Sequence, residues 1–207
     1  MIQVTNSELV QLFHQEIRRI QPTVFIEVGC REGEASIITK VSIPSCKVFA
    51  YEAGKETYDL FHPRIAEMGV LHKNLAISNE RGCASFYKKK DRATNGANSL
   101  MLRRNQGAWT DIQKVDKNTL DNLHDTEHQC FCLWIDAEGH GYEVLQGAKE
   151  VLKKTQLVLI EVEEEERWVN QKLDMDIIDF LANDFDVVAK DQQYPKQYNL
   201  VFKRKSK

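Results

Sequence analysis

The sequence lacks the features that mark several large classes of protein. No apolar stretch among its 207 residues approaches the roughly 18 residues of a membrane-spanning helix. Residues Met1 to Asn6 have neither the basic start nor the apolar run of a signal peptide. The five cysteines lack the paired spacing of a zinc site, and their odd number favours free thiols in a reducing compartment. We therefore expect a cytoplasmic protein with no membrane partner.

An excess of charge of one sign is also missing. The 28 basic and 31 acidic residues give a formal net charge of −3, which offers no general attraction for a nucleic acid. No internal repeat, low-complexity tract or linker divides the chain. The length fits one α/β domain with a substantial core. We expect no nucleic-acid partner, and the sequence leaves the oligomeric state open.

An N-terminal helix is expected within residues 1–22, ahead of the main domain at residues 23–207. Thr5 and Glu8 match a capping box, and Pro22 ends the apolar helical spacing that follows. The main domain alternates short buried strands with helices, which predicts a mostly parallel, doubly wound sheet. Strands are expected at residues 24–29, 47–52, 70–78, 83–87, 130–136, 157–162, 185–189 and 199–203, and helices at residues 34–41, 56–68, 142–153 and 175–182. The last two strands have no helix between them and predict a terminal antiparallel hairpin.

Residues 88–110 interrupt this alternation with a polar stretch that has no periodicity. Loops of this length inside a compact domain are usually lids or binding segments. The basic residues of the stretch are Lys88, Lys89, Lys90, Arg92, Arg103 and Arg104. Such a cluster can hold a phosphate or a carboxylate, and Arg103 is our candidate for a contact with the substrate. A solvent-exposed loop is the alternative.

A glycine turn and two acidic residues indicate a site for a nucleoside cofactor. In the pattern Glu27-x-Gly29-x-x-x-Gly33, the glycines let the chain turn sharply after a strand and approach a ligand closely. The spacing is not that of the dinucleotide fingerprint, and the acid suits a ligand with a cationic amino-acid portion, such as S-adenosylmethionine. Glu52, at the tip of the next strand, is placed to accept the hydroxyls of a ribose. A structural corner and an exposed glutamate are the alternatives.

Acidic and imidazole side chains follow the later parallel strands. Asp136, Glu138 and His140 leave one strand just before a helix, at the sheet edge where ligands bind in such folds. They are our candidate catalytic residues, because an acid or an imidazole can act as a general base. Helix-start charges and a capping histidine are the alternatives. Glu161 lies in an otherwise apolar strand, with Glu163 on the same face, so we expect Glu161 to face the crevice and contact the substrate, with a basic partner as the alternative.

Residues 133–148, LWIDAEGHGYEVLQGA, carry the most specific pattern in the chain. The stretch resembles the Lys-Ile-Asp-Val-Glu-Gly…Glu…Leu-x-Gly-Ala segment of the FkbM-type methyltransferase family. Supporting segments lie at residues 76–82, 98–100, 115–121 and 159–162, and the resemblance runs from about Thr23 to Phe202. The chain departs from the family pattern with Gly29-Cys30-Arg31 in place of Gly-Ala-Asn, Glu52-Ala53 in place of Glu-Pro, and Trp134 in place of a lysine.

The resemblance implies a class I methyltransferase with a Rossmann-like fold and S-adenosylmethionine as the methyl donor. The cofactor residues that it implies are Glu27, Gly29, Gly33 and Glu52, to which we add Cys30 and Ala76. It places Asp136, Glu138 and Glu161 at the reacting end.

The acceptor that the resemblance implies is a hydroxyl group on a sugar or natural-product scaffold. We therefore predict an O-methyltransferase of small-molecule or glycan acceptors. The hydroxyl proton would go to Asp136 or His140, or Mg²⁺ bound by Asp136 and another acid would make the hydroxyl more acidic, and the sequence does not choose between these. The alternatives are a methyltransferase that acts on an amine or a protein, and a module that binds the cofactor without catalysis.

Overall fold

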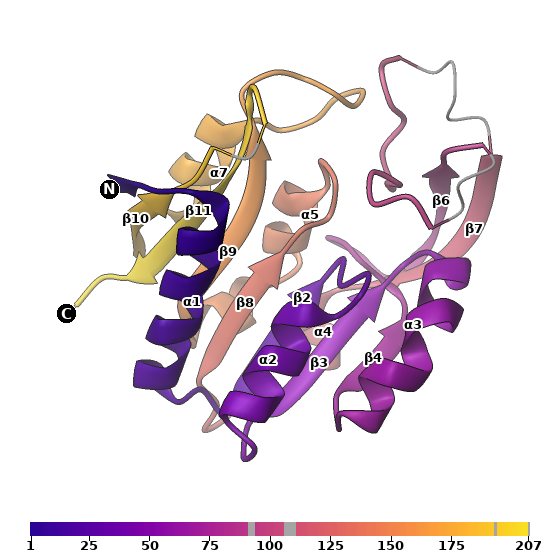
Figure 1. The fold of residues 1–207 in the computed structure, drawn as a ribbon. Helices are drawn as coiled ribbons and strands as arrows, with labels where there is room; N and C mark the ends of the chain where they lie inside the picture. The colour runs from indigo at the N-terminus through magenta and orange to yellow at the C-terminus, as the bar shows by residue number, and fades with distance from the viewer. Residues whose placement is uncertain (91–93, 106–110, 193, 207) are drawn as a thin grey trace.

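A sheet of eight strands forms the centre of the computed structural model, which describes residues 1–90, 94–105, 111–192 and 194–206 (Figure 1). Its strand order is β1-β10-β11-β9-β8-β2-β3-β4. The strands are β1 (Ile2–Gln3), β2 (Val24–Val28), β3 (Lys47–Glu52), β4 (Leu71–Asn74), β8 (Phe131–Ile135), β9 (Thr155–Glu163), β10 (Phe185–Lys190) and β11 (Gln197–Arg204). Strands β4, β3, β2, β8 and β9 run parallel to one another, as the alternation of strands and helices predicts.

Helices cover both faces of this sheet, because its central strands are apolar on both sides. Along β2, Phe25 packs into one core cluster and its neighbour Ile26 into the other. The helices on the Phe25 face are α1 (Asn6–Ile20), α2 (Glu34–Ser42) and α3 (Lys55–Glu67). Those on the opposite face are α4 (Leu120–Leu123), α5 (Gly141–Gln146), α6 (Lys149–Lys153) and α7 (Asp174–Leu181). The predicted capping box of Thr5 and Glu8 is present at the start of α1.

The chain ends in the antiparallel hairpin that the sequence predicts. Strand β11 pairs antiparallel with β9 on one side and with β10 on the other, so the last strand lies between two earlier ones. Strand β1 pairs parallel with β10 at the edge of the sheet. The predicted fold class, a doubly wound and mostly parallel sheet with a terminal antiparallel hairpin, is therefore confirmed. Among the described residues, no helix is long and apolar enough to cross a membrane.

A second sheet of three strands differs from the sequence prediction. Its strands are β5 (Ala76–Ile77), β7 (Asp111–Asn118) and β6 (Gly82–Lys88), in that order. The strand expected within residues 70–78 is instead two strands, β4 in the large sheet and β5 in the small one, with Leu75 between them. Strand β7 has no counterpart in the prediction, because only Val115 along it is buried and no apolar alternation marks it.

The helix expected at residues 142–153 is interrupted at Gly147. There the backbone passes so close to Ser78 that a Cβ atom on Gly147 would lie 2.1 Å from the Ser78 carbonyl oxygen. Two short helices, α5 and α6, result. The contact holds the end of β5 against the helices that follow β8.

Candidate active site

A cavity of about 460 Å³ opens at the carboxyl ends of the parallel strands. Its wall includes Val28 at the end of β2, Glu52 at the end of β3, Asp136 just after β8 and Glu161 near the end of β9. Ligands bind at this edge in open α/β sheets, because the loops that leave neighbouring strands diverge there. The cavity is therefore the candidate active site.

The glycine turn after β2 lies directly against the loop after β8. Gly29 has a φ of +75°, and a Cβ atom on it would lie 1.8 Å from the carbonyl oxygen of Asp136. A residue with a side chain does not fit there, so the two loops touch only because position 29 is glycine. Gly29 also lines the cavity, which places this contact beside the ligand space.

Three of the residues predicted at the cofactor lie outside the cavity wall, as far as the described residues define it: Glu27, Cys30 and Gly33. Glu27 accepts a hydrogen bond of 2.9 Å from the Ser36 N–H at the start of α2. Burial raises the pKa of Glu27 to about 7. Cys30 Sγ lies 3.3 Å from Nε2 of His72, in the core beneath the turn. Their contact with a cofactor stays a prediction.

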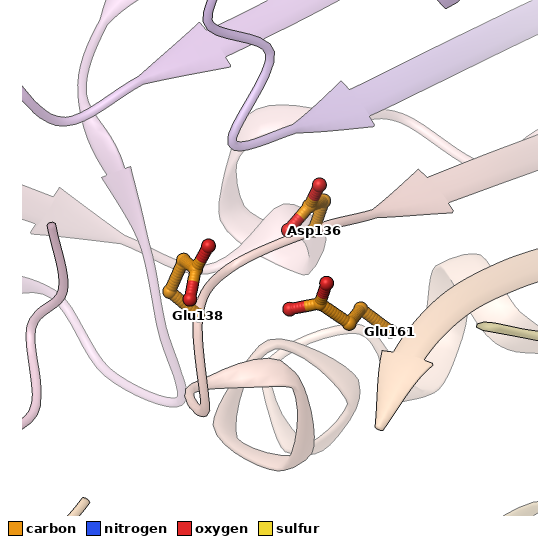
Figure 2. Close-up of side chains that lie close together, drawn as sticks. All are labelled: Asp136, Glu138 and Glu161. Carbon is orange, nitrogen blue, oxygen red and sulfur yellow. The ribbon is translucent and has the colours of Figure 1, made fainter. Parts of the chain in front are cut away.

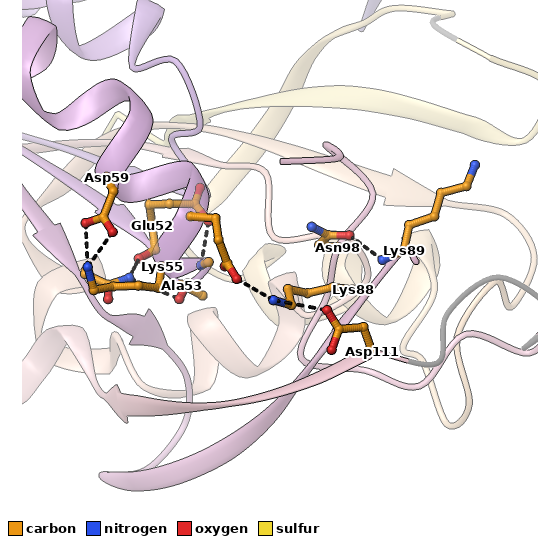
Figure 3. A network of polar contacts seen from close by, with 11 residues as sticks. Glu52, Ala53, Lys55, Asp59, Lys88, Lys89, Asn98 and Asp111 are labelled. Atoms are coloured by element: carbon orange, nitrogen blue, oxygen red, sulfur yellow. Dashed lines mark hydrogen bonds and ion pairs between the residues drawn. The ribbon is translucent and has the colours of Figure 1, made fainter. Parts of the chain in front are cut away.

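Glu52 lines the cavity with a carboxylate that the backbone holds in one orientation (Figure 3). Its oxygens accept hydrogen bonds from the N–H of Gly54 at 2.7 Å and from the N–H of Arg31 at 3.1 Å. Burial raises the pKa of Glu52 to about 7, although these two hydrogen bonds act in the opposite direction. A fixed acceptor therefore stands at the tip of β3.

Next to Glu52 the cavity wall is apolar. Leu75, Ala76 and Ile77 line it from β5 and the residue before β5, and Phe86 lines it from β6. Ala76 is one of the predicted cofactor residues, whereas sequence reasoning missed Phe86, because nothing local shows that the second sheet folds over the first. The small sheet thus supplies an apolar wall beside the carboxylate.

Three carboxylates meet in another part of the same cavity (Figure 2). Each of Asp136, Glu138 and Glu161 offers an oxygen, and these oxygens lie within 4.8 Å of one another. Burial raises the pKa of Asp136 to about 6. Burial, together with the charges of neighbouring acids, raises the pKa of Glu138 and of Glu161 well above the usual range. The sequence predicted these three residues for the reacting end, and the fold brings them together.

Arginine side chains moderate this concentration of negative charge. Arg31 lowers the pKa of Asp136, and Arg103 and Arg167 lower the pKa of Glu138, in each case against the larger effect of burial. All three arginines line the cavity. Sequence reasoning missed Arg167, because it follows the acidic run Glu163 to Glu166, a pattern typical of a solvated surface.

The other basic residues of the stretch 88–110 do not share the position of Arg103. Lys88 is buried and pairs with Glu56 at 2.6 Å and with Asp111 at 3.3 Å (Figure 3). Arg104 pairs with Glu166, and Lys90 is exposed. Arg92 lies outside the described residues. Of the predicted cluster, as far as the structure describes it, Arg103 alone lines the cavity.

His140 stands at the start of α5 and also lines the cavity. Its Nε2 lies 3.0 Å from the hydroxyl oxygen of Ser78. Burial, with a smaller effect of the Lys117 charge, lowers the pKa of His140 to about 4. The imidazole is therefore neutral near pH 7, and one of its nitrogens already has a partner.

The described segment 94–105 crosses from the small sheet to the chain after β9. Ser99 exchanges backbone hydrogen bonds with Tyr87, and its hydroxyl donates to the carbonyl of Glu138 at 2.6 Å. Further along, the N–H of Arg104 donates to the carbonyl of Arg167. Because residues 95–100 line the cavity, this segment forms part of its wall and is tied to the acid cluster.

A model of the methyltransferase FkbM domain matches residues 27–194. The fold is similar to that of the O-methyltransferase TomG from Streptomyces achromogenes, involved in tomaymycin synthesis and solved in complex with SAM (TM-score 0.56, 12% identity, 98% of this chain and 82% of that chain). It is also similar to an rRNA methylase from Streptococcus thermophilus (TM-score 0.51, 9% identity, 100% and 99%). A precorrin-6y C5,15-methyltransferase from Geobacter metallireducens is a third example (TM-score 0.51, 13% identity, 98% and 90%). At such identities the likeness shows the fold alone. No curated protein matches the chain.

Proposed function

The chain belongs to the FkbM methyltransferase family, and we propose that it transfers the methyl group of S-adenosylmethionine to a hydroxyl group of a sugar or another small molecule. The observation that carries the proposal is one cavity with an oriented carboxylate and an apolar wall in one part and three half-buried, clustered carboxylates in another. The first part suits a nucleoside, and the second suits a hydroxyl group that must lose a proton.

The residues around Glu52 fit the nucleoside of the cofactor. Glu52 would accept the ribose hydroxyls, since two backbone N–H groups already orient its carboxylate. Ala76, Ile77 and Phe86 would enclose the adenine with apolar surface. When bound, the cofactor supplies a methyl carbon that a sulfonium has activated for displacement. The protein's part is then to align the acceptor with that carbon, which can lower the barrier by several kcal/mol.

Asp136 is our candidate for the acceptor of the hydroxyl proton. It stands at the end of β8, beside both Gly29 and the other two acids, so it lies between the two parts of the cavity. With a pKa of about 6 it is mostly ionised at neutral pH and still basic enough to take a proton. Glu138 and Glu161 would hydrogen-bond the acceptor. His140 is less suited to the role of base, because Nε2 faces Ser78.

The same three carboxylates also have the ligand type that Mg²⁺ prefers. If the site takes the ion, Asp136, Glu138 and Glu161 would hold it, and it would lower the pKa of an acceptor hydroxyl. Methyl transfer measured with EDTA and then with added Mg²⁺ distinguishes the two forms of the proposal. Activity that EDTA removes and Mg²⁺ restores assigns the acids to a metal, whereas activity that resists EDTA assigns Asp136 as the base.

Hydrogen bonding rather than stacking should recognise the acceptor. Trp168 lines the cavity but is only 1% exposed, because Gly139 packs against the indole and Arg103 lies over it. It therefore offers no free face for a sugar ring. The polar side chains of Gln197, Arg103 and Arg167 also line the cavity. This arrangement favours an acceptor with several oxygen atoms.

The proposal is tested by transfer of a labelled methyl group from S-adenosylmethionine to a panel of sugars, phenols, amines and peptides. We expect label in an acid- and base-stable ether on a sugar or another polyhydroxylated compound. Label on amines or peptides alone would replace the hydroxyl acceptor with a nitrogen acceptor. Calorimetry that finds no binding of S-adenosylmethionine or S-adenosylhomocysteine would overturn the methyltransferase proposal itself.

A further inference from the structure

Arg31 is the residue of the glycine turn whose side chain lines the cavity together with Glu52 and Asp136. It has a φ of +42°, and its N–H donates to the carboxylate of Glu52. The backbone of this residue is therefore tied to the proposed ribose site. Its guanidinium lies close enough to Asp136 and Glu52 to lower the pKa of both carboxyl groups.

Within the described part of the chain, the ion pair of the Arg31 guanidinium is a long one. Its partner is Glu32 at 3.6 Å, a distance beyond a good charge-assisted hydrogen bond, and the Arg31 side chain is 53% exposed. On the other side, a Cβ atom on Gly96 would lie 3.6 Å from Nη1 of Arg31, so the backbone of the crossing segment rests beside the guanidinium. The cation is thus partly enclosed and faces the cavity between two acidic groups.

S-adenosylmethionine carries a positive sulfonium, which the positive charge of Arg31 would repel. If the cavity takes this cofactor, Arg31 must therefore face a negative group of the ligand. The methionine portion of the cofactor ends in a carboxylate and an ammonium. With the nucleoside beside Glu52, Arg31 is an adjacent cation on the cavity wall, because its own N–H donates to Glu52. Arginine presents a planar fork of N–H donors that matches a carboxylate.

We propose that Arg31 binds the carboxylate of the methionine portion of the cofactor, an inference that rests on the proposed function. The guanidinium supplies the positive charge that this end of the ligand requires, and Gly96 limits how far it can swing away. The Gly29-Cys30-Arg31 sequence, which departs from the Gly-Ala-Asn of the family, would then give this chain its own contact with the cofactor.

A different role for Arg31 would be to neutralise the buried acids without touching the ligand. In that case its removal would change the state of Glu52 and so alter the binding of every ligand that uses the ribose site. In the proposed role, its removal weakens the binding of ligands that have the amino-acid carboxylate by far more than the binding of ligands that lack it. The two roles therefore predict different results for ligands with and without that group.

The test is calorimetric binding of two ligands to the full chain. S-adenosylhomocysteine has the amino-acid portion and a neutral sulfur, whereas 5′-methylthioadenosine has the same nucleoside and no amino-acid portion. We expect Arg31→Met to weaken the binding of S-adenosylhomocysteine by on the order of 10- to 100-fold, as the loss of a charge-assisted contact implies, and to change the binding of 5′-methylthioadenosine by far less, since the two ligands share the effect of the Arg31 charge on Glu52. Arg31→Lys should recover part of the loss. Arg64→Met, at an exposed position of α3, is the matched control for both ligands.

The outcomes separate the inference from the proposed function. Equal weakening of both ligands by Arg31→Met, or no weakening of either, overturns the role of Arg31 and leaves the methyltransferase intact. Failure of the wild type to bind either ligand overturns both. Circular dichroism and thermal unfolding of each variant show that the altered chain is folded, so a lost fold is not mistaken for a lost contact.

Discussion

At the scale of single residues, burial determines the protonation of the acids in and near the cavity. It raises the pKa of Glu27, Glu52 and Glu163 to about 7 and that of Asp136 to about 6, in each case chiefly by removing the carboxylate from water. Groups that titrate in this range can exchange protons during a reaction near neutral pH. The acids at the carboxyl ends of β2, β3, β8 and β9 are therefore chemically unlike acids on the surface.

Replacement of Asp136 tests the proposed proton acceptor. We expect Asp136→Asn to lower kcat by about 10²- to 10⁴-fold, the range typical of a lost general base, and to leave the chain folded. In the wild type, kcat should rise as the pH passes about 6, because only the ionised form of Asp136 accepts a proton. Methyl transfer measured from pH 5 to 9 checks both, with exposed Asp125→Asn as the control. A variant with wild-type kcat and the same pH profile would exclude the role.

Glu27 links the pH to the stability of the fold. Its pKa is about 7 in the folded chain and near 4.5 in an ordinary environment, so the folded state keeps the proton longer and loses stability as the pH rises from 4.5 to 7. Glu27→Gln keeps an acceptor for the Ser36 N–H and cannot ionise. We expect its free energy of unfolding, relative to wild type, to be higher at pH 8 than at pH 5 by on the order of 2–3 kcal/mol. Urea unfolding at the two pH values measures the difference, and a constant offset would contradict the prediction.

At the scale of elements, close backbone contacts hold the loops of the site together. The β2–α2 loop meets the β8–α5 loop at Gly29, and the end of β5 meets the turn between α5 and α6 at Gly147. Each contact joins segments that are distant in the sequence. Because the cavity lies among these loops, its shape depends on contacts that only a residue without a side chain permits.

Substitution of Gly147 measures the second of these contacts. Its φ of −87° is open to any residue, so the cost of Gly147→Ala comes from the collision with the Ser78 carbonyl. We expect a loss of about 1–3 kcal/mol in the free energy of unfolding, as for an overpacked site. Gly69→Ala is the comparison, because its φ is +76° and a Cβ atom there would make only an ordinary contact of 3.4 Å with the flexible Lys40 side chain, which leaves mainly a backbone cost of roughly 1 kcal/mol. If Gly147→Ala lowers the free energy of unfolding clearly less than Gly69→Ala does, the backbone at Ser78 moves aside at little cost and the prediction is wrong.

At the scale of the whole molecule, one cavity draws its wall from most of the chain. The central sheet, the small sheet, the crossing segment 94–105 and the terminal hairpin all contribute residues, from Val28 to Gln197. A ligand that fills the cavity therefore contacts parts of the chain that unfold together. Binding at this place should stabilise the entire fold and not one loop.

Addition of the cofactor product tests this coupling. At a concentration about 100 times its Kd, S-adenosylhomocysteine should add about 2.7 kcal/mol to the free energy of unfolding, which for a chain of this size raises Tm by roughly 5–10 °C. Methionine at the same concentration is the control, because it lacks the nucleoside that Glu52 would hold. A Tm that does not respond at saturating S-adenosylhomocysteine would argue against a ligand in this cavity.

Local patterns predicted the frame of the molecule and part of its site. Alternating strands and helices predicted the parallel sheet, and the strand ends predicted that Gly29, Glu52, Asp136 and Glu161 would share one edge of it. These inferences succeed because a strand that is buried on both faces needs apolar residues at successive positions, and such a run is visible in the sequence. Strand β7 was not predicted, since a strand with one buried apolar residue has no such run.

What the tertiary structure alone decided is how the side chains of that edge meet. The register between β8 and β9 brings the oxygens of Asp136, Glu138 and Glu161 within 4.8 Å of one another, and no local pattern encodes a distance between strands. The direction of Glu27, which turns to the start of α2, depends on the free N–H groups of that helix. Sequence by itself determined which residues arrive at the carboxyl edge of the sheet. Packing between distant segments decided which of these residues face the cavity. The same packing sets how far each carboxylate is buried, and burial sets its pKa and therefore its charge.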